Sequence, residues 1–484
     1  MKRAILFVLP LLLLLGCGDR ASRREAQDLP EIQRDWEQIA EDGVLRAITN
    51  YSGTSYFLYR GEPMGFEYEL LKRLADHLEL ELEIVLAENI DSILPMLKRG
   101  EGDLIAFGLT ITQERKTQIS FTDYLYLTRQ VLVQRKPEGW RNLKRHQLEA
   151  QLIQEPVELI GDTVSVRLET SYFKRLVHLM DEVGGTIYID TLPGSMSSEK
   201  SVQAVLNGEI TYTVVDDNIA AISAAYHPEL DVGTPVSFAQ RIGWGVRQSS
   251  PALLDTLNDW VAGFKKEVDY AVIYNKYYKN KRAYRKRVNS EFYSLNEQRI
   301  SPYDDLIRQE ATRIGWDWRL MAAQVYQESQ FDPKATSWAG AAGLLQLMKG
   351  TASDLGVDDR LDPEENLQGA ADYLAQIEAN FSEVPDSLQR IKLTLASFNC
   401  GYYHVLDAQS LAEKRGLDPQ RWDENVEAMI LELSFPANYR DEVVKYGYVK
   451  GVEPFNYVRE IFERYDRYRQ FIERDSGVDV PEVL

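Results

Sequence analysis

The sequence has little of the chemistry on which metal sites and disulfides depend. Its 484 residues include 2 cysteines, Cys17 and Cys400, and 5 histidines that stand far apart along the chain. Structural zinc sites need clustered cysteine and histidine ligands, so we predict no metal site. The sequence also lacks a glycine-rich phosphate loop, and no other motif calls for a cofactor.

Positive charge is also in short supply. The chain has 55 lysines and arginines against 75 aspartates and glutamates, which gives a formal net charge of −20. Nucleic-acid phosphates require clustered cations, so we exclude nucleic acid as a partner, whereas sugar polymers remain acceptable. We interpret residues 271–300 as a basic linker, either a solvated helix or an interdomain seam, with anionic headgroups as the alternative. Its cations include Lys276, Lys279, Lys281, Arg282, Arg285, Lys286 and Arg287.

The apolar run at residues 4–15 is too short to form a transmembrane helix. Lys2 and Arg3 precede it, which is the layout of a secretory signal over residues 1–16, and a plain signal anchor is the alternative. The sequence Leu-Leu-Gly-Cys that ends at Cys17 resembles a bacterial lipobox. This resemblance implies acylation of Cys17, so that the mature protein is anchored to a membrane without spanning it.

A lipidated Cys17 has consequences for the neighbouring chain. Residues 17–42 carry many charges and few large apolar clusters, which predicts a tether. Cys400 is left without a partner in its own chain, so we expect no intramolecular disulfide even in an oxidising compartment. Gly18 stands where some bacteria use aspartate for inner-membrane retention. We therefore expect the periplasmic face of the outer membrane, although the sequence leaves the inner membrane open.

Residues 43–270 alternate strands with helices. This alternation predicts parallel sheets with crossover helices, arranged as two similar α/β lobes in series with a cleft between them. We expect strands at 44–48, 82–86, 103–107, 164–166, 186–189 and 212–215, and helices at 65–78, 90–99, 171–180 and 198–207.

Three stretches in this region resemble the periplasmic solute-binding proteins for polar amino acids. They are Gly-Phe-Glu-Tyr-Glu-Leu-Leu at 65–71, Gly-Asp-Leu-Ile at 102–105, and 109–115, which leads to Phe-Thr-Asp at 121–123. The resemblance implies that Arg115 holds a ligand carboxylate with help from Thr110. It also implies that Asp216 or Asp217 receives an amino group, and that the ligand is an amino acid or a muropeptide.

The same resemblance has one departure, and Arg115 has a second interpretation. Glu169-Thr170 replaces the family's usual Gly-Thr, which adds a negative charge near a helix start where the ligand would lie. Arg115 could instead be a structural ion-pair residue. The ligand of this region therefore stays open.

From residue 301 the chain is strongly helical, and one glutamate stands out. A helix expected over 319–329 places Met321, Val325 and Glu328 on one stripe, so the carboxyl of Glu328 should emerge beside buried apolar groups. Such surroundings raise a glutamate pKa enough to retain a proton, which makes Glu328 a candidate general acid. A solvated surface glutamate is the alternative.

The residues around Glu328 resemble the soluble-type lytic transglycosylases. Gln-Glu-Ser at 327–329, Ala335, Ser337 and the run from Gly340 to Met348 match that family's signature without a gap. The resemblance implies a mainly α, goose-type lysozyme-like domain over residues 301–472, followed by a C-terminal tail at 473–484. It implies Glu328 as the catalytic acid, Ser337 and Gln346 as orienting groups, and Met348 as a wall of the sugar site.

Two further motifs support this resemblance. Ser-Phe-Asn-Cys-Gly at 397–401 resembles the family's Ala-Tyr-Asn-Ala-Gly, although Phe398 lacks the usual hydroxyl. Asn399 either contacts substrate or braces a turn. The Tyr-Val motif at 457–458 implies that Tyr457 hydrogen-bonds the acid or the substrate, and an ordinary packed tyrosine is the alternative.

The resemblance implies a lytic transglycosylase that acts on peptidoglycan glycan strands. Glu328 would protonate the oxygen between MurNAc and GlcNAc, then remove the proton of the MurNAc C6 hydroxyl as a 1,6-anhydro ring closes. The first region would regulate access by closing on its ligand. The rival functions are a goose-type lysozyme that hydrolyses with water, and a binding lipoprotein whose C-terminal region is inactive. Oligomeric state and endolytic or exolytic cleavage stay open.

Overall fold

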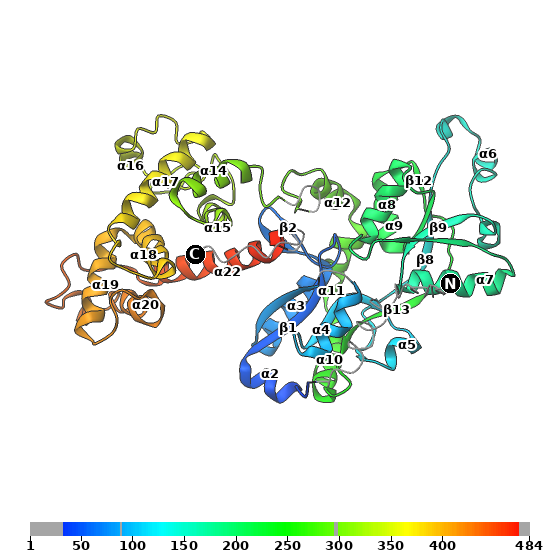
Figure 1. Cartoon of the computed structure of the whole chain (residues 1–484), viewed down its shortest axis with the longest axis horizontal. Coiled ribbons are helices and arrows are strands. Elements are labelled where there is room, and N and C mark those ends of the chain that lie inside the picture. The colour runs from blue at the N-terminus through cyan, green and yellow to red at the C-terminus, as the bar shows by residue number, and fades with distance from the viewer. Residues whose placement is uncertain (1–31, 88–89, 295–298, 474–484) are drawn as a thin grey trace, which may run out of the picture. The chain divides into compact units, whose positions relative to one another are not determined.

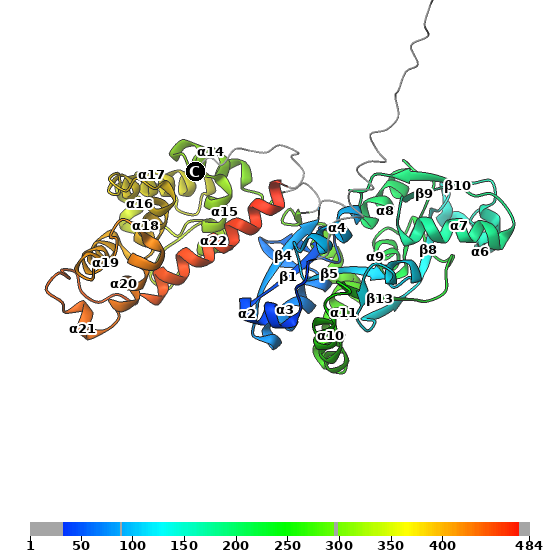
Figure 2. The same ribbon diagram turned by 60° about the horizontal axis from the view of Figure 1, so that its bottom comes forward.

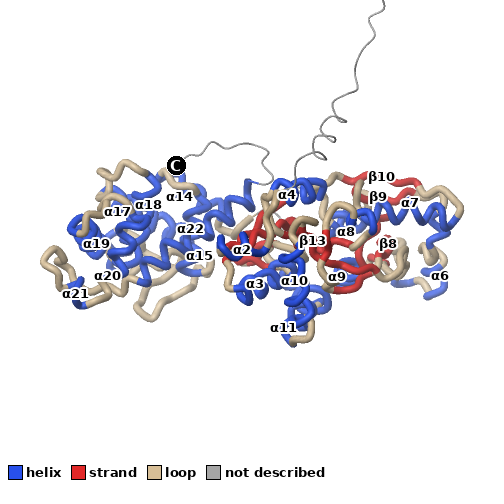
Figure 3. Tube along the Cα trace, turned by 90° about the horizontal axis from the view of Figure 1, so that it is seen from below, coloured by secondary structure: helices blue, strands red, loops and turns tan. Residues whose placement is uncertain are grey.

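The computed structural model describes residues 32–87, 90–294 and 299–473. The chain forms two compact units, which are not consecutive along it. The first combines the residues up to Tyr56 with Met64–Tyr284, and the second combines Phe57–Pro63 with the residues from Arg285 onward. Strands gather in the first unit, whereas helices dominate the second (Figure 3). Within the described ranges, no helix has the length and apolar character needed to cross a membrane.

The first lobe of the first unit is built on a six-stranded sheet. Across it run β4 (Glu81–Ala87), β1 (Val44–Asn50), β5 (Leu104–Thr110), β13 (Gln240–Val246) and β6 (Ser120–Phe121), with β7 (Tyr126–Thr128) also paired to β13. β1 is parallel to β4 and β5, as the alternation of strands and helices predicted, and β13 returns antiparallel to β5. Helices α3 (Phe66–Leu78) and α4 (Ile93–Arg99) make the crossovers, and Ile48, Leu97 and Ile105 are fully buried.

The second lobe has two smaller sheets. One contains β11 (Tyr212–Asp216), β8 (Gln130–Arg135) and β12 (Leu230–Asp231), and here β8 is antiparallel to both neighbours, where the sequence predicted parallel strands. The other pairs β9 (Thr163–Arg167) in parallel with β10 (Tyr188–Leu192). Three helices follow these strands: α7 (Ser171–Val183), α8 (Ser198–Asn207) and α9 (Asp217–Tyr226). Thr170 and Ser197 cap the first two of them by accepting backbone N–H groups. The starts of α7 and α8 therefore both carry polar side chains.

The described end of the predicted tether belongs to the first unit. Helix α2 (Trp36–Asp42) begins at Asp35, whose carboxylate also accepts the backbone N–H of Leu253 at 2.7 Å. Arg34 Nε donates to Asp103 at 2.7 Å, and Ile39 is fully buried. These long-range contacts order a segment whose local composition predicted a loose connection. Cys17, the signal sequence and the rest of the tether lie outside the described residues.

The predicted basic linker is also folded, up to residue 288. Helices α10 (Pro251–Phe264) and α11 (Val268–Tyr274) lead into a π-helical turn at Asn275–Lys279 and then α12 (Lys281–Val288). Tyr277 and Tyr278 of this turn are buried, and Lys276 Nζ lies 2.5 Å from Glu69 Oε1. Because these aromatic side chains pack into the first unit, that compact unit extends to Tyr284.

The second unit is a helical domain built around its last helix. α22 (Val452–Glu473) packs against α15 (Trp318–Ser329) and α18 (Ser387–Cys400), and α15 lies beside α22 in both Figure 1 and Figure 2. The α/β lobes followed by a mainly helical domain confirm the predicted fold class. Other α-helices described in this unit include α14 (Asp304–Ile314), α16 (Lys349–Asp354), α17 (Pro363–Ala379), α19 (Tyr402–Lys414), α20 (Glu427–Glu432) and α21 (Pro436–Tyr439).

Candidate functional site

Glu328 lies near the C-terminal end of α15, as the sequence predicted. Asp317 caps the helix by accepting the backbone N–H of Arg319 at 2.8 Å, and Met321 and Val325 on the same stripe are fully buried. Glu328 itself is partly buried, and burial raises its pKa to about 7, although a hydrogen bond from Tyr457 lowers it. A carboxyl with this pKa holds its proton for much of the time near neutral pH.

Tyr457 and Gln324 form a buried chain of hydrogen bonds that ends on Glu328. The Tyr457 hydroxyl donates to Glu328 Oε1 at 2.5 Å, and Gln324 Nε2 donates to the Tyr457 hydroxyl at 3.2 Å. Burial and the neighbouring carboxyl both raise the pKa of Tyr457, so its hydroxyl stays protonated and remains a donor. The structure therefore brings Tyr457 to the acid, where the sequence left packing as the alternative.

An open groove surrounds this acid. Asn399 lies in it together with Glu328 and Tyr457, so three of the residues singled out from the sequence share one groove. Amide and ammonium groups in the same groove supply the hydrogen-bond donors that a polar sugar needs. The groove is lined by Gln327, Glu328, Asn399, Lys450, Val452, Glu453, Asn456, Tyr457 and Glu460.

The other two carboxylates of the groove already have partners. Glu460 Oε2 accepts a hydrogen bond from Gln327 Nε2 at 2.7 Å. Glu453 lies 2.7 Å from Lys450 Nζ. Both carboxylates are therefore already engaged by a neighbouring side chain. Among the described groove residues, Glu328 is the carboxyl suited to donate a proton.

Ser337, Gln346 and Met348 are not among the described residues that line this groove. Ser337 Oγ accepts the backbone N–H of Ala341 at 3.0 Å. Gln346 has a positive φ of 46°, and its Nε2 donates to the carbonyl oxygens of Ala335 and Gly343 at 3.0 and 2.8 Å. Met348 is 47% exposed at the start of α16. Two of these three side chains therefore brace the small-residue loop between α15 and α16.

Phe398 packs in the helical domain and does not supply the polar contact to the acid. Phe398 packs against Tyr373, with ring centroids 5.6 Å apart, and the neighbouring Ser397 hydroxyl is buried without a hydrogen-bond partner. The polar contact to the acid comes instead from Tyr457 and, behind it, from Gln324. Sequence reasoning missed Gln324 and Gln327. The available signal was an amide at position 324, on a helix turn that is otherwise apolar.

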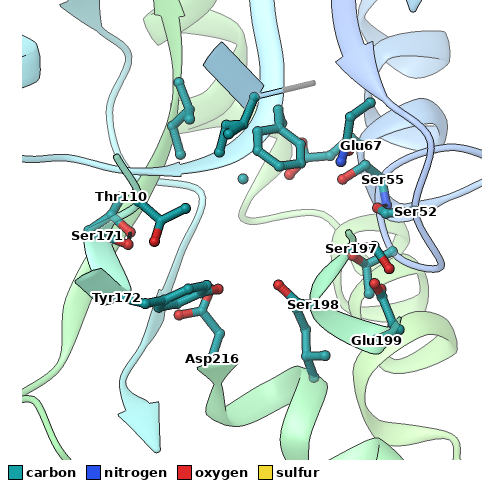
Figure 4. A pocket seen from close by; sticks show the side chains of 18 of the residues that line it. Ser52, Ser55, Glu67, Thr110, Ser171, Tyr172, Ser197, Ser198, Glu199 and Asp216 are labelled. Carbon is teal, nitrogen blue, oxygen red and sulfur yellow. Dashed lines mark hydrogen bonds between the residues drawn. The ribbon is translucent and has the colours of Figure 1, made fainter. Parts of the chain in front are cut away.

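The first unit contains a polar cavity, to which both lobes contribute. Thr110 and Arg115 reach it from the first lobe, and Asp216 reaches it from the second. Figure 4 shows Thr110 close to Ser171, and Thr110 Oγ1 donates to Ser171 Oγ at 3.3 Å. Lys174 Nζ also lies 2.5 Å from Glu114 Oε2. These contacts join the lobes at the cavity.

The structure separates the two aspartates that the sequence could not distinguish. Asp216 is 8% exposed, and burial raises its pKa to about 7, although a hydrogen bond from Tyr172 lowers it. Asp217 is not among the described residues that line the cavity; it accepts from Thr128 Oγ1 at 3.0 Å and lies 3.4 Å from Arg129. A one-residue step across the start of α9 turns the two side chains in different directions.

Arg115 carries few contacts for a desolvated guanidinium. It lies on the short helix α5 (Gln113–Lys116), and its Nη1 donates to the carbonyl oxygen of Thr110 at 3.0 Å. Burial lowers the pKa of Arg115. No ion pair with Arg115 occurs among the described residues. Nowhere in residues 32–87, 90–294 and 299–473 do three His, Cys, Asp or Glu side chains lie close enough together to hold a metal ion.

Comparison with known families covers both units. Residues 45–280 match the model of the bacterial extracellular solute-binding proteins, family 3, and residues 305–419 match that of the transglycosylase SLT domain. Among solved structures, the ancestral amino acid-binding protein AncCDT-1 is 25% identical, covers 50% of this chain and 99% of its own, and has a TM-score of 0.42.

Relatives match over nearly the whole chain. The membrane-bound lytic murein transglycosylase F of Desulfosudis oleivorans is 34% identical over 448 residues, which is 93% of this chain and 93% of that protein. The protein of the same name from Pseudomonas fluorescens strain Pf-5 is 32% identical over 433 residues, which is 89% of this chain and 85% of that protein.

Proposed function

Because this chain belongs to the membrane-bound lytic murein transglycosylase F family, and is a lytic transglycosylase of peptidoglycan, we propose that Glu328 is its catalytic acid. The observation that supports this proposal is the pKa of Glu328, raised to about 7, in a groove whose other carboxylates are already paired. A general acid works best when its pKa lies close to the operating pH.

The proposed reaction uses one carboxyl twice. Protonated Glu328 donates to the glycosidic oxygen between MurNAc and GlcNAc as the bond from that oxygen to the MurNAc anomeric carbon breaks. The resulting carboxylate then takes the proton of the MurNAc C6 hydroxyl, whose oxygen bonds to the same anomeric carbon. The proton is returned and no water is consumed. Because the nucleophile belongs to the substrate, the groove has to position it rather than activate water.

The other groove residues serve binding and positioning in this proposal. Asn399 contacts the sugar, and Tyr457 orients Glu328 through its hydrogen bond. Ser337 and Gln346 act on the substrate through the loop that they brace, and Met348 presents an exposed apolar side chain at the end of that loop. Small residues in the loop allow the polymer to approach closely.

Replacing the acid tests this proposal directly. Glu328→Gln should lower the release of 1,6-anhydro-muropeptides from purified peptidoglycan by a hundredfold or more, roughly, because an amide cannot transfer the proton. Mass spectrometry of the digest measures this release. The matched control is Glu463→Gln, an exposed carboxylate paired with Arg459 on α22, which should keep wild-type activity. Near wild-type release by Glu328→Gln would contradict the proposal.

Melting of the same variant controls for folding. The folded-state pKa of Glu328, about 7, lies above the ordinary value of 4.5, so its contribution to stability is fully present below pH 4.5 and is lost as pH rises through 7. Glu328→Gln cannot ionise. We therefore expect it to melt no lower than the wild type at pH 8, so that a loss of activity reflects chemistry.

The same mass spectra separate this function from hydrolysis. A goose-type lysozyme would add one water to each cleaved bond, whereas ring closure adds none. Products that carry the mass of an added water would therefore identify the reaction as hydrolysis and contradict ring closure.

We propose that the cavity of the first unit binds a ligand that bears a carboxylate and an amino group, and that binding regulates the enzyme. This proposal is supported by the presence of Arg115, Thr110 and Asp216 in the lining of one cavity; Arg115 and Thr110 bind the carboxylate, and Asp216 binds the amino group. A buried guanidinium with a single hydrogen bond has donors left for a planar anion. Regulation requires a ligand that binds two states of the protein with different affinity.

Calorimetry with wall peptides and amino acids tests this binding. Arg115→Ala should weaken binding at least about tenfold, because it leaves the ligand carboxylate without its charged partner. Arg145→Ala, whose side chain is 91% exposed, is the matched control. Equal affinities for Arg115→Ala and the unaltered protein would remove Arg115 from the site.

We also propose that Cys17 is acylated and anchors the protein at the periplasmic face of the outer membrane. Two features support this proposal, namely the Leu-Leu-Gly-Cys sequence that ends at Cys17 and the membrane-bound naming of the relatives.

A further inference from the structure

Apart from Glu67, whose Oε2 accepts a hydrogen bond from the Trp244 indole, four charged side chains line the cavity of the first unit without an oppositely charged partner. They are two arginines, Arg115 and Arg167, and two acids, Glu199 and Asp216. Over the described part of the chain, none of these four groups forms an ion pair with another side chain. Burial of a charge is costly unless it is paired, so these groups point to a charged occupant.

Three carboxylate oxygens of the two acids lack a hydrogen-bond donor within the described ranges. Both carboxylate oxygens of Glu199 and Oδ1 of Asp216 are buried without a hydrogen-bond partner. Asp216 is only 8% exposed. Figure 4 shows Asp216 beside Tyr172 on one side of the cavity and Glu199 beside Ser197 on the other. Two acids at separate places call for two separate cationic groups.

The two arginines lack an anionic partner among the described residues. Arg167 is 8% exposed at the end of β9, and no described hydrogen bond engages its guanidinium. Arg115 uses one N–H for the carbonyl oxygen of Thr110. A guanidinium stays charged when buried, and its fork matches a carboxylate. The pair therefore calls for two carboxylates.

Tyr172 lies among the four charges. Its hydroxyl bonds Asp216, and Arg115, Arg167 and Glu199 all lie within electrostatic range of it. The third acid of the cavity, Glu67, also has no ion pair among the described residues: its Oε2 accepts a hydrogen bond from Trp244 Nε1 at 2.6 Å, and its Oε1 is buried without a hydrogen-bond partner. The cavity is also lined by hydroxyl-bearing residues, namely Ser52, Thr54, Ser55, Thr110, Thr170, Ser171, Ser197 and Ser198.

We propose that the cavity takes a compact diamino dicarboxylic acid. Its carboxylates bond to Arg115 and Arg167, and its ammonium groups bond to Asp216 and Glu199. A simple amino acid satisfies one arginine and one acid and leaves the other two charges buried and unpaired, which is a large penalty for a polar site. This inference rests on the proposed ligand-binding function of the first unit and specifies the chemistry of its ligand.

Calorimetry of the full chain with a graded ligand series tests the inference. The series contains meso-diaminopimelate, L-lysine without the second carboxylate, L-glutamate without the second ammonium group, and L-alanine without either. We expect meso-diaminopimelate to bind at least about tenfold more tightly than lysine or glutamate, with alanine weakest. Equal affinity for lysine, glutamate or alanine would overturn the inference while leaving ligand binding intact. Absence of binding by every ligand would contradict the proposed binding function itself.

A wall peptide distinguishes the free molecule from its peptide-bound form. In the tripeptide L-Ala-γ-D-Glu-meso-diaminopimelate, one ammonium group of the diamino acid has become an amide. We expect this tripeptide to bind at least about tenfold more weakly than free meso-diaminopimelate, because one acid is left unpaired. Tighter binding of the tripeptide would overturn the assignment of two ammonium contacts.

Two variants assign the contacts. Arg167→Gln should weaken meso-diaminopimelate about tenfold and leave lysine unchanged, since lysine has no second carboxylate. Glu199→Gln should weaken meso-diaminopimelate and leave glutamate unchanged. The exposed Arg145→Gln is the control. An equal loss for every ligand would show that the variant damages the cavity generally and would overturn the assigned contacts. The series on the unaltered chain decides the ligand class even if both variants fail to fold.

Discussion

At the scale of single residues, the behaviour of Glu328 depends on its proton. Burial raises the pKa of this carboxyl to about 7, and the Tyr457 hydroxyl opposes the rise by donating to it. The reaction begins from the protonated acid, so activity should fall as pH rises through 7. Gln324 influences Glu328 indirectly. Its Nε2 donates to the hydroxyl oxygen of Tyr457 and favours the orientation in which Tyr457 donates to Glu328.

Gln324→Leu removes the hydrogen bond from Gln324 to the Tyr457 hydroxyl. The Tyr457 hydroxyl becomes a weaker donor, the charged form of Glu328 loses stabilisation, and its pKa rises. We expect the alkaline limb of the pH–activity profile to move upward by a few tenths of a pH unit to about 1 unit. The rate of anhydro-muropeptide release between pH 5 and 9 measures the shift.

A double-mutant cycle is the control for this prediction. In a Tyr457→Phe background the hydroxyl through which Gln324 acts is absent, so adding Gln324→Leu should produce no further shift of the limb. An unmoved limb in the single variant, or an equal shift in both backgrounds, would show that Gln324 fills space without influencing the acid.

At the scale of elements, the short hairpin of β2 (Phe57–Tyr59) and β3 (Glu62–Met64) is notable because residues 57–63 belong to the second unit. Tyr468 donates to the carbonyl oxygen of Gly61 at 3.1 Å. Arg464 lies 3.2 Å from Glu62 Oε1 and also donates to Gln327 in the active-site groove at 3.0 Å. A segment within the solute-binding match is thus part of the framework that holds a groove residue.

Gly61→Ala tests how firmly the hairpin is built into the second unit. Gly61 has a φ of +75°, and a Cβ there would lie 2.6–2.8 Å from side-chain atoms of Tyr468, Tyr326 and Phe331. We expect overpacking to lower the free energy of unfolding by about 1–3 kcal/mol. Each kcal/mol should lower Tm by about 2–4 °C. Calorimetric melting of the full chain measures the change.

Gly315→Ala is the matched control for this substitution. Gly315 has nearly the same φ, +77°, but nothing lies within 4 Å of its Cβ position. Both variants carry the same backbone strain, so the difference between their Tm values reports the crowding at the hairpin. Equal Tm values would indicate that the hairpin moves away without cost.

At the scale of the whole molecule, the chain joins a solute-binding unit to a transglycosylase unit, and its N-terminus carries the proposed anchor. We expect the unaltered chain, expressed in a bacterium supplied with labelled fatty acid, to incorporate the label. Cys17→Ser should incorporate none, because the acylated thiol is gone. Cys400→Ser is the control and should keep the label. Label in Cys17→Ser, or none in the unaltered chain, would contradict lipidation.

Short-range patterns in the sequence predicted the fold class, but not the antiparallel pairing of β8 with β11 and β12 or the place of residues 57–63 in the second unit. The alternation of strands and helices predicted the two lobes, and the helical stripe through Met321, Val325 and Glu328 predicted the acid, since both patterns depend on neighbours in the chain. Family motifs then indicated peptidoglycan transglycosylase activity, which the comparisons confirmed. The assignments of individual site residues stay predictions.

Long-range packing supplied what these patterns could not. The Gln324–Tyr457 and Glu62–Arg464 contacts join residues more than 100 positions apart. The pairing of Asp217 with Arg129, and the absence of ion pairs at Arg115, Arg167, Glu199 and Asp216 among the described residues, likewise depend on which side chains packing brings together or keeps apart. Local periodicity determines which face of an element a residue occupies. The partner that meets this face depends on how distant segments bury their surfaces together, which no local pattern encodes.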